Sequence, residues 1–586
     1  MNDIRDHAFL GVTESLTARR WIGPSIEEDR LSEAMTQETG LPAPLCRILV
    51  KRGIPAREAG AFLAPTLRDQ MPDPRTLKDM ETAAARFREA VQRKEKIAIF
   101  ADYDVDGGAS AALLITWLRD MGLQSTLYIP DRIDEGYGPN EAAMADLAAN
   151  HDLIICVDCG TLSYGPIAAA KGADVIVLDH HLGGETLPDA AAIVNPNRQD
   201  ESGDLAHLCA AAVVFLMLVE TNRQMREAAQ KGPDLMAMLD LVALATVADV
   251  APLIGVNRAF VRQGLAIMAR RQRIGLTALA DVAGLDQSPT SYHLGFLLGP
   301  RVNAGGRIGQ ADLGARLLAC DDPHEAAAMA ERLDQLNTER REIESQVRDQ
   351  ALAQATERGL DGPLVWAAGE GWHPGVVGIV ASRLKEVTNR PAIVIGLDGD
   401  IGKGSGRSVS GIDLGASIQR LSADGLLIKG GGHKMAAGLT VAKDQINAVM
   451  DRLGDLLAKQ GAADMGPADL RLDGLLMPSA ANVDLITQIE NAGPFGAGAP
   501  APRFVFPDCH IHFAKQVGAN HLKISFGDGI GQRVDGICFG AMDTPLGPAL
   551  IKHNAGRFHL AGRLEINIWQ GRQSAQLRLE DAAPAY

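Results

Sequence analysis

The stretch IAIFADYDVDGG, residues 97–108, decides the fold around it. Its opening run, Ile97–Phe100, is short and apolar, as is typical of a buried strand. Three aspartates follow at every second position: Asp102, Asp104 and Asp106. In an extended segment such residues share one face, so we expect the three carboxylates to lie together. Clustered carboxylates repel one another unless a cation lies among them.

Three interpretations of this stretch are open. An EF-hand calcium loop begins with the same D-x-D-x-D-G pattern. However, position 12 counted from Asp102 is Leu113 rather than Glu, and a strand-like run rather than a helix precedes the pattern. A solvated acidic turn after a strand is the simplest alternative. A divalent-metal site for phosphate chemistry is the third, and the rest of the chain favours it.

Two further strand-like runs end in groups that bind metals. Strand-like runs alternate with helix-like segments over residues 96–195, which predicts βαβ units and a parallel sheet. LIICV is followed by Asp158, and VIVL is followed by Asp179, His180 and His181. In an open α/β sheet the carboxyl ends of parallel strands meet at one edge, where ligands bind. We therefore expect these side chains to form one site with the aspartates at 102–106.

A fourth element adds another carboxylate. The apolar run LVALATVADVAP, residues 241–252, contains a proline breaker and predicts a buried element that ends near Asp249. Pairing with a helix dipole or an arginine explains this aspartate equally well. Carboxylates with imidazole and without thiolate suit Mn²⁺ or Mg²⁺ better than a structural zinc, and the histidine favours Mn²⁺.

The chain has 586 residues, of which 46% are hydrophobic and 22% are charged, as is typical of a globular protein. Its length predicts three or four domains. The net charge of −16 argues against coating a nucleic acid over the whole surface, but not against a basic channel. Residues 401–440 hold five Lys and Arg against two Asp, a local net charge of +3.

Three observations predict a cytoplasmic protein with no membrane association. MNDIRDHAF carries charges where a signal peptide needs an apolar run. The longest apolar run, 208–219, has 12 residues, too few to span a bilayer. The seven cysteines are scattered and odd in number, so they predict no disulfide framework. Cys156 and Cys159 overlap a strand end, and we interpret them as structural.

Ordered motifs make the chain resemble a known family. DYDVDG, VDCG, LDHH and TVADV, in that order, resemble the DHH phosphoesterase superfamily, named after the tripeptide at 179–181. Later motifs resemble its RecJ family of single-strand-specific 5′→3′ exonucleases, over roughly residues 40–586: LGPRVNAGGRI, LDQLNTERREIE, GWHPGVVGIVASRL, GSGRSVSG and GGHKMAAG. One departure is the alanine run 210–212, where the family tends to carry glycine.

The resemblance implies a role for each candidate residue. Two Mn²⁺ or Mg²⁺ ions would be held by a set of six side chains, with Asp158 bridging: Asp102, Asp104, Asp106, Asp158, His180 and Asp249. His181, expected to face away from His180, would contact the scissile phosphate, and Asp179 would orient a histidine. Substrate phosphates would be held by residues of two domains: Arg301, Asn303, Arg307, Ser405, Arg407 and His433.

The remainder of the chain has weaker patterns. From Pro323 to about Gly359 there is no internal breaker, which predicts one amphipathic helix of ~36 residues connecting two lobes. Two glycine-rich stretches, 402–408 and 430–433, are expected to be turns that bind phosphate. Short strand-like runs recur after 467 and predict a small β-barrel, with Phe504, Phe506, Phe513 and Trp569 as candidate stacking or core residues.

The expected fold class is α/β: a parallel-sheet DHH domain, a long helix, a second α/β domain called DHHA1, and a C-terminal OB-fold barrel. The expected boundaries are a helical region over 1–80, the DHH catalytic domain over 81–320, the connector helix over 321–360, the DHHA1 substrate-binding domain over 361–462 and the OB fold over 463–586.

The expected function is metal-dependent 5′→3′ exonuclease action on single-stranded DNA, in DNA repair and recombination, by a monomer. A helicase and a single-strand-binding protein are candidate partners. One alternative is a phosphoesterase of the same superfamily acting on oligoribonucleotides or cyclic dinucleotides, which would lack the barrel. Another is a non-catalytic replication scaffold, which would have lost ligand residues.

Overall fold

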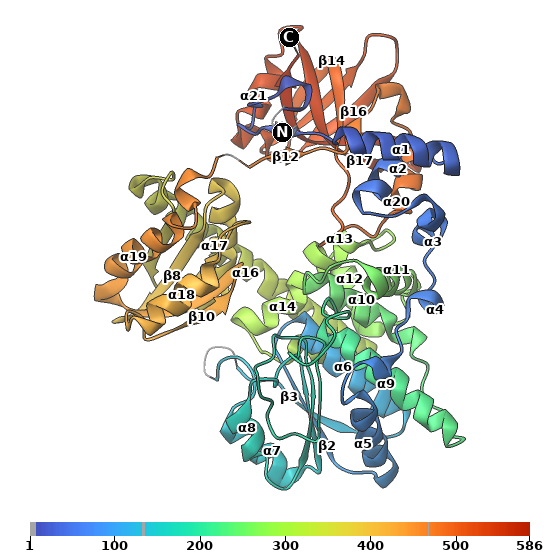
Figure 1. Ribbon diagram of the computed structural model, residues 1–586, viewed down its shortest axis with the longest axis vertical. Coiled ribbons are helices and arrows are strands. Elements are labelled where there is room, and N and C mark those ends of the chain that lie inside the picture. Colours follow the sequence, from blue (N-terminus) through green and yellow to red (C-terminus); the bar gives the residue numbers. More distant parts are fainter. Residues whose placement is uncertain (1–7, 132–134, 467, 586) are drawn as a thin grey trace. The chain divides into compact units, whose positions relative to one another are not determined.

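The protein, seen as a computed structural model, is described over residues 8–131, 135–466 and 468–585 (Figure 1). The chain divides into two units: Met71–Gly466 forms one, and Met1–Gln70 joins Pro467–Tyr586 in the other. The first of these holds a parallel sheet, a long helix and a mixed sheet, in that order along the chain. Within the described ranges no helix has both the length and the apolarity to cross a bilayer.

A five-stranded parallel sheet carries the predicted strand ends. Its order is β3-β2-β4-β5-β6 and each neighbouring pair is parallel, which confirms the prediction of βαβ units. All residues of β2 and β4 are buried, as expected for strands of a parallel sheet with helices on its faces. The elements are β2 (Ile97–Ala101), β3 (Ser125–Tyr128), β4 (Leu153–Val157), β5 (Asp174–Leu178) and β6 (Ala192–Val194), with α5 (Met80–Arg93), α6 (Val105–Asp120), α7 (Glu141–Asn150) and α8 (Tyr164–Ala169).

A set of helices completes this domain. The apolar run noted in the sequence begins α9, in which every residue of 210–218 is at most 1% exposed, so it is a core helix. The helices are α9 (Ala210–Glu227), α10 (Leu239–Ala248), α11 (Gly255–Met268), α12 (Ile274–Val282), α13 (Ser291–His293), the π-helical turn η6 (Leu294–Leu298), α14 (Gly299–Ile308) and α15 (Leu313–Ala319).

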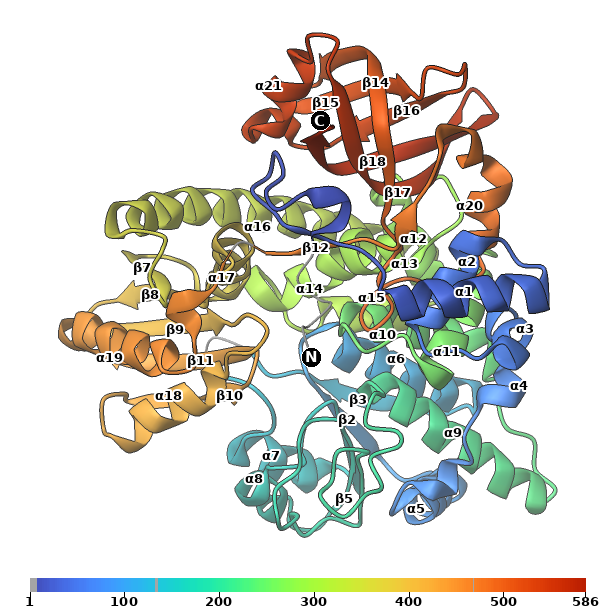
Figure 2. The same cartoon turned by 45° about the horizontal axis from the view of Figure 1, so that its top comes forward.

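The connector is one helix, α16 (Pro323–Arg358), of 36 residues and about 54 Å at 1.5 Å per residue. Asp322 caps its start, and Gly359, at φ 96°, follows its end. It packs against α12 and α14 on one side, and against β7 (Val365–Glu370) and α17 (Pro374–Thr388) of the next domain (Figure 2). The predicted helical link between the two α/β domains is confirmed.

The second domain contains a mixed sheet in the order β10-β11-β9-β8-β7, in which only β7 and β8 are parallel. A hydrophobic core lies between this sheet and two helices, α18 and α19. The remaining elements are β8 (Ala392–Asp398), β9 (Ile401–Arg407), α18 (Leu414–Ala423), β10 (Lys429–His433), β11 (Ala436–Ala442) and α19 (Ile446–Ala458).

The expectation that 402–408 and 430–433 are glycine turns is wrong, because they form β9 and β10. Gly402, Gly404 and Gly406 all face the core, where an added Cβ would come within 2.5–3.0 Å of Ile393 or Ile395 side chains. The neighbouring strands supply the side chains that fill this layer. Glycine is thus required on the buried face of a strand, although its intrinsic strand preference is low.

The smaller unit is built on a barrel. Strands run in the order β13-β14-β15-β16-β18-β17, and an additional β14–β17 pairing closes the ring, which confirms the predicted OB-type barrel. Its elements are α1 (Ile26–Thr39), α2 (Ala43–Lys51), α3 (Ala59–Leu63), α4 (Leu67–Gln70), β1 (Trp21–Ile22), β12 (Leu470–Arg471), β13 (Gly474–Leu475), α20 (Val483–Glu490), β14 (Phe504–Val517), β15 (His521–Gly527), β16 (Arg533–Cys538), α21 (Leu546–Ile551), β17 (Arg557–Trp569) and β18 (Arg572–Pro584).

Residues near the start of the chain belong to the barrel unit. β1 pairs in parallel with β12, and the buried Trp21 donates a hydrogen bond of 2.8 Å from Nε1 to Oδ2 of Asp581. Leu45 and Leu49 of α2 lie in the same hydrophobic core as Phe506. Residues of 8–70 therefore contribute to the core of the barrel unit.

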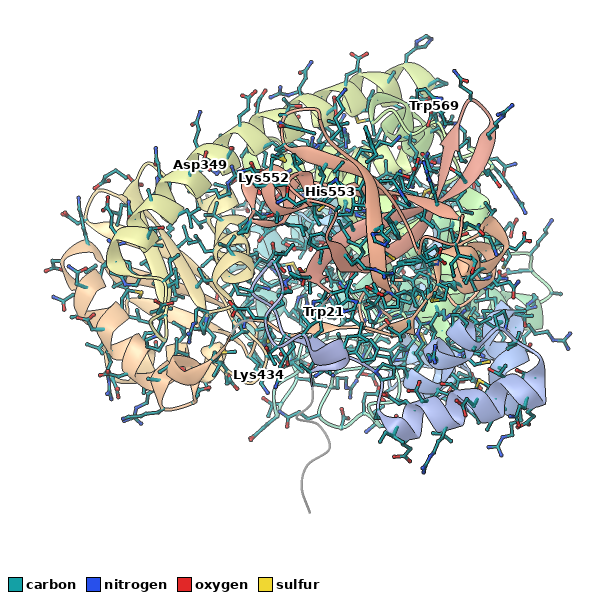
Figure 3. The ribbon with its side chains drawn as sticks, turned by 90° about the horizontal axis from the view of Figure 1, so that it is seen from above. Trp21, Asp349, Lys434, Lys552, His553 and Trp569 are labelled. Carbon is teal, nitrogen blue, oxygen red and sulfur yellow. The ribbon has the colours of Figure 1, made fainter. Side chains whose placement is uncertain are left out.

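The four candidate aromatic residues divide into two pairs. Phe504 and Phe506 are 1% and 0% exposed and fill the barrel core. Phe513 is 46% exposed, and Trp569, where β17 ends, is 71% exposed (Figure 3). Only the second pair can offer a ring face to a ligand.

Candidate metal centre and phosphate-binding face

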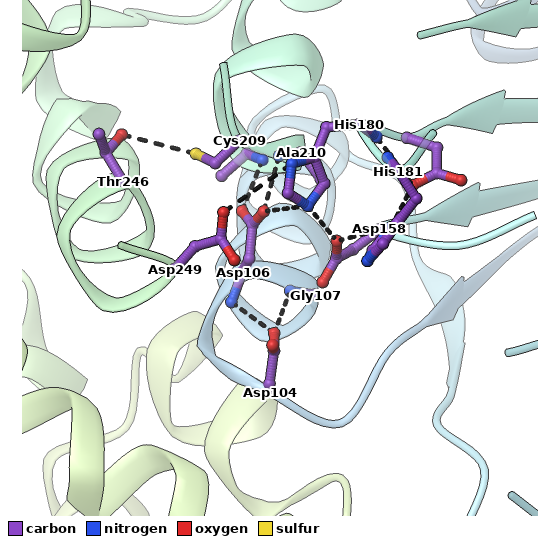
Figure 4. Close-up of polar contacts among 12 residues, drawn as sticks. Asp104, Asp106, Gly107, Asp158, His180, His181, Cys209, Ala210, Thr246 and Asp249 are labelled. Atoms are coloured by element: carbon purple, nitrogen blue, oxygen red, sulfur yellow. Dashed lines mark hydrogen bonds and ion pairs between the residues drawn. The ribbon is translucent and has the colours of Figure 1, made fainter. Parts of the chain in front are cut away.

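The carboxyl ends of three strands and one helix bring the predicted residues together (Figure 4). Asp102 follows β2, Asp158 follows β4, and the Asp179–His181 tripeptide follows β5. Asp249 is the C-cap of α10 and lies 3.8 Å, Oδ2 to Nδ1, from His180. The sheet-edge argument therefore identified the correct place in the fold.

The expectation of one extended aspartate face at 102–106 is wrong. Asp104 is the N-cap of α6, and its Oδ1 accepts from the backbone N–H groups of Asp106 and Gly107 at 2.8 and 3.2 Å. Asp106 is thus in the first turn of a helix. Its two carboxylate oxygens accept from the backbone N–H groups of Ala210 and Ala211, at 2.7 and 2.8 Å. These donors are at the N-terminus of α9, where the helix dipole favours a negative charge.

The ligand atoms form three overlapping groups, each within 4.8 Å: Asp106 with His180 and Asp249; Asp102 with Asp104 and Asp158; and Asp158 with His180 and His181. Asp158 and His180 each belong to two groups. His180 Nε2 lies 3.2 Å from Asp158 Oδ1 and 3.7 Å from Asp106 Oδ2. The three groups therefore adjoin one another through Asp158 and His180.

Asp179 fixes the turn after β5. Its Oδ1 accepts from the backbone N–H of His180 at 2.7 Å and from Nδ1 of His181 at 2.8 Å. Its Oδ2 accepts from the hydroxyl of Thr161 at 2.6 Å. Because this carboxylate draws both groups towards itself, the segment curls, and the two histidine rings lie 4.6 Å apart. The expectation that His181 faces away from His180 is therefore wrong.

Three residues of this site were missed by sequence reasoning. Asn195 donates from Nδ2 to the backbone O of His181 at 2.7 Å, and Asn197 donates to the backbone O of His180 at 2.6 Å. Both follow β6, so the sheet-edge argument was sufficient to find them. Tyr137 donates from its hydroxyl to the backbone O of Asp158 at 3.1 Å and lies 3.1 Å from Nε2 of His181. No local pattern distinguishes this tyrosine.

Burial and mutual repulsion set the charge state of the carboxylates. Burial, and then the charges of Asp106 and Asp104, raise the pKa of Asp158 well above its usual value. Burial and the same two charges raise the pKa of Asp249 to about 8. Against its own burial, the hydrogen bond and charge of Asp179 raise the pKa of His181 to about 9. The site therefore needs added positive charge to hold its carboxylates ionised at neutral pH.

Stability without metal should reflect this repulsion. A carboxyl whose pKa is higher in the folded than in the unfolded chain binds more protons when folded, so its contribution to stability falls as pH rises between the two pKa values. For Asp249 this window runs from about 4 to about 8. In metal-free protein, Asp249→Asn should unfold several degrees above wild type at pH 8, with a smaller difference at pH 5.

Thermal unfolding in a chelator across this pH range measures the effect. Asp146→Asn, on the exposed face of α7, is the control and should shift neither midpoint. A variant at Asp249 that is no more stable than wild type at pH 8 would contradict the repulsion.

The donor set fits two hard divalent cations. Oxygen ligands dominate, imidazole is present, and thiolate is absent from the three groups, which suits Mn²⁺ or Mg²⁺. Asp158 Oδ1 is buried and accepts no well-directed hydrogen bond from the described residues, although His180 Nε2 lies 3.2 Å away. Such an oxygen is costly to bury unless a cation lies beside it.

Helix α14 places the first-domain phosphate candidates. Asn303 accepts from the backbone N–H of Val105 at 3.1 Å, so it supports the segment 102–106, here called the aspartate loop. Arg307 donates from Nη1 to the backbone O of Gly375 at 2.9 Å, on the first turn of α17. Arg301 is buried and bonded to Asp334 of α16 at 2.8 Å. Its contacts join two helices, and its proposed role towards phosphate stays a prediction.

Ser405, Arg407 and His433 lie on one face of the second sheet. Arg407 pairs with Ala436, which pairs with His433 on the next strand, so these three form one row across β9, β11 and β10. The next row consists of Ser405, Gly438 and Gly431. Polar side chains therefore surround a floor of small residues. The structure brings these candidates together as predicted, although on strands rather than turns.

The comparisons with known proteins cover the whole architecture. The DHH family, N-terminal domain model matches residues 96–246, the DHHA1 domain model matches 361–459, and the RecJ OB domain model matches 472–581. The single-stranded-DNA-specific exonuclease RecJ of Dickeya dadantii is 38% identical over 566 residues, which is 93% of this chain and 96% of that protein.

Two crystal structures of RecJ from Thermus thermophilus resemble the fold. The complex with Mn²⁺ has a TM-score of 0.79 at 28% identity and covers 96% of this chain and 79% of that one. The complex with Mg²⁺ has a TM-score of 0.73 at 27% identity and covers 96% and 78%. Both ions are those to which the donor set is suited.

Proposed function

Because this chain belongs to the RecJ family of single-stranded-DNA-specific exonucleases, we propose that it removes nucleotides from the 5′ end of single-stranded DNA by metal-dependent hydrolysis. The observation that carries this function is the shared position of Asp158 and His180 in overlapping ligand groups at the sheet edge. Repair and recombination of DNA are the processes that consume such an activity.

The chain's own residues have distinct tasks at the metal centre. Asp106, His180 and Asp249 would hold one Mn²⁺ or Mg²⁺ ion, and Asp102 and Asp104 would hold the second, with Asp158 placed beside both His180 and this pair of aspartates. Such ions, when bound, would supply a water nucleophile of lowered pKa and positive charge beside the phosphate. His181, oriented by its hydrogen bond with Asp179, would donate to an oxygen of the scissile phosphate. The N-terminus of α9 holds Asp106 in place.

The second sheet holds the end of the strand. Arg407, Ser405 and His433 offer donors on one face, and the floor of Gly438 and Gly431 permits a phosphate to approach the backbone closely. Arg307 reaches α17 from α14, and Gly378 of α17 packs against the side chains of Ser405 and Arg407. The segment that carries Asp102, Asp104 and Asp106 is therefore linked through α14 and α17 to the sheet face that carries Ser405 and Arg407.

The rival functions are not favoured. A phosphoesterase for oligoribonucleotides or cyclic dinucleotides is expected to lack the barrel. The barrel of this chain matches a RecJ OB domain. A non-catalytic scaffold has no use for a complete ligand set, and all six metal-binding candidates here are Asp or His and lie in the three groups.

The free cysteines favour one cellular compartment, and the domain content favours one oligomeric state. All seven cysteines are free, which fits the reducing cytoplasm. One chain carries the metal centre, the phosphate-binding face and the barrel, so we expect a monomer to suffice. A helicase and a single-strand-binding protein would supply and present its substrate.

A time course on end-labelled strands tests the function. The protein should shorten single-stranded DNA stepwise from the 5′ end with Mn²⁺ or Mg²⁺, spare blunt duplexes and act poorly on RNA. Internal cleavage as the first product, or activity only on dinucleotides, would refute the proposal.

Removing the barrel unit should weaken binding more than chemistry. A chain of residues 71–466 retains the whole metal centre and the phosphate-binding face. Stacking contributes about 1–3 kcal/mol per base, so we expect its Kd for a 30-mer single strand to rise at least about 10-fold. Its single-turnover cleavage rate at saturating DNA should change less. Equal Kd values for the two chains would exclude the barrel from binding.

A further inference from the structure

Two large aromatic side chains of the DHH domain are exposed side by side. Tyr292 and Phe296 lie four positions apart, their ring centroids are 5.1 Å apart, and their planes differ by 27°. They are 53% and 66% exposed, whereas Phe215 and Phe260 of the same domain are at most 1% exposed. Two adjoining exposed rings form an apolar patch, which is a surface feature at which ligands can bind.

A π-helical turn holds this pair against the helix that delivers a metal ligand. Gly295 lies within η6 and Gly299 follows it, and Cβ atoms added to them would lie 3.4 Å from Val247 and 3.3 Å from Ala248. These two residues form the last turn of α10, directly before Asp249. Glycine permits the close approach, and single π turns occur frequently at functional sites.

Helix α14, which follows η6 directly, reaches the other side of the metal centre. Farther along, on α14, Asn303 accepts from the N–H of Val105, and Gly306 packs against the backbone of Tyr103 in the aspartate loop. The segment 291–308 therefore contacts the residues directly before Asp249 and, farther along, the residues between Asp102 and Asp106, with the aromatic pair at one end.

Val250 gives a second, independent sign of function at this end of α10. It follows Asp249, is 69% exposed and has a φ of 60°. A β-branched residue in the left-handed region is strained, and such strain is concentrated at ligand-binding and active sites. Its methyl groups are exposed to solvent at the end of the helix on which the π turn packs.

We infer that Tyr292 and Phe296 form a stacking platform for a base of the single strand whose phosphate is at the metal centre. This inference rests on the proposed function. It adds that the aromatic pair contacts a base of the substrate strand. Every base has a flat apolar face, so stacking binds a strand without reading its sequence, as a general exonuclease requires. The platform lies within one helical turn of the contact with α10, which sets the distance between the stacked base and the bound phosphate.

The test combines a protein variant that lacks one aromatic ring with a DNA substrate that lacks one base. The substrates are 5′-phosphorylated 30-mer single strands, either intact or with one abasic residue stepped along the first ten positions. Phe296→Ala should lower kcat/KM on intact DNA by roughly 5- to 100-fold, mainly through KM. Wild type should show a similar loss at one or two abasic positions. At those positions Phe296→Ala should cost almost nothing more, because the partner of the ring is already absent.

Further variants separate stacking from folding. Phe296→Trp should keep most activity, whereas Phe296→Leu, which retains apolar bulk without the ring, should behave like alanine and decides the matter if Phe296→Ala is unfolded. Val387→Ala removes an equally exposed apolar side chain from the end of α17 and should behave as wild type on every substrate.

Each outcome has one meaning. Wild type that fails to degrade intact single strands would overturn the proposed function itself. If wild type is active, a Phe296 variant without effect, or one with the same loss at every abasic position, would overturn the platform alone. An effect of Phe296→Ala that disappears at one or two abasic positions, with normal unfolding midpoints, would support it.

Discussion

Asp158→Ala is expected to lower kcat on single-stranded DNA by at least about 10³-fold while the fold remains intact. Asp158 belongs to two of the three ligand groups, one with Asp102 and Asp104 and the other with His180 and His181, so we expect its loss to weaken both proposed ion positions. Several kcal/mol of charge stabilisation in the transition state depend on them, and each 1.4 kcal/mol is a factor of ten. Single-turnover assays at saturating Mn²⁺, with Mn²⁺ affinity measured by calorimetry, determine the effect.

Stability provides the control for this variant. Burial and four neighbouring aspartates raise the pKa of Asp158, so its removal relieves repulsion in the metal-free protein. The midpoint of metal-free Asp158→Ala should equal or exceed that of wild type, and added Mn²⁺ should stabilise it less. Asp146→Ala, on the surface of α7, should keep full activity. Residual activity above a few per cent for Asp158→Ala would refute its bridging role.

Arg407→Ala should reveal how the enzyme recognises an end. A terminal 5′-phosphate carries more charge than an internal diester and offers one more acceptor oxygen, which a guanidinium fork exploits better than a point charge. Loss of a charge-assisted bond of about 1.5–3 kcal/mol should lower kcat/KM by roughly 10- to 100-fold on 5′-phosphorylated strands. The loss on 5′-hydroxyl strands should be much smaller, and Arg407→Lys should recover only part.

The measurement compares rates on one oligonucleotide with and without its 5′-phosphate. Arg420→Ala removes an arginine that pairs with Asp424 on α18, in the same domain, and should affect neither substrate. If Arg407→Ala loses the same factor on both substrates, Arg407 grips the strand generally or supports β9, and recognition of the end belongs to another residue.

Sequence reasoning succeeded where a local pattern decides the structure. Asp102, Asp158 and His180 were found because buried strands have clear boundaries and parallel strands share an edge. The expectation that Asp106 lies on one extended face with Asp102 and Asp104 failed because the helix starts immediately after Asp104, and the cap depends on amides that no spacing of aspartates reveals.

Other features depend on partners distant in the sequence. Gly402–Gly406 looks like a loop because glycine disfavours strands, yet Ile395 and Leu439 on the neighbouring strands require it there. The hydrogen bond between Trp21 and Asp581 joins residues 560 positions apart, so no local pattern could associate the first residues with the barrel. Such tertiary determinants are visible only in the fold.

The alternation in β9 has a consequence for how this stretch can vary. Glycines occupy its buried face, and Lys403, Ser405 and Arg407 occupy the other, with β8 and β11 bonded on either side. Inserting or deleting one residue would exchange the two faces, placing these polar side chains in the core and glycine on the face that now holds Ser405 and Arg407. In lineages that keep this activity, the stretch between Ile401 and Arg407 can therefore exchange residues on its polar face, but its length is fixed.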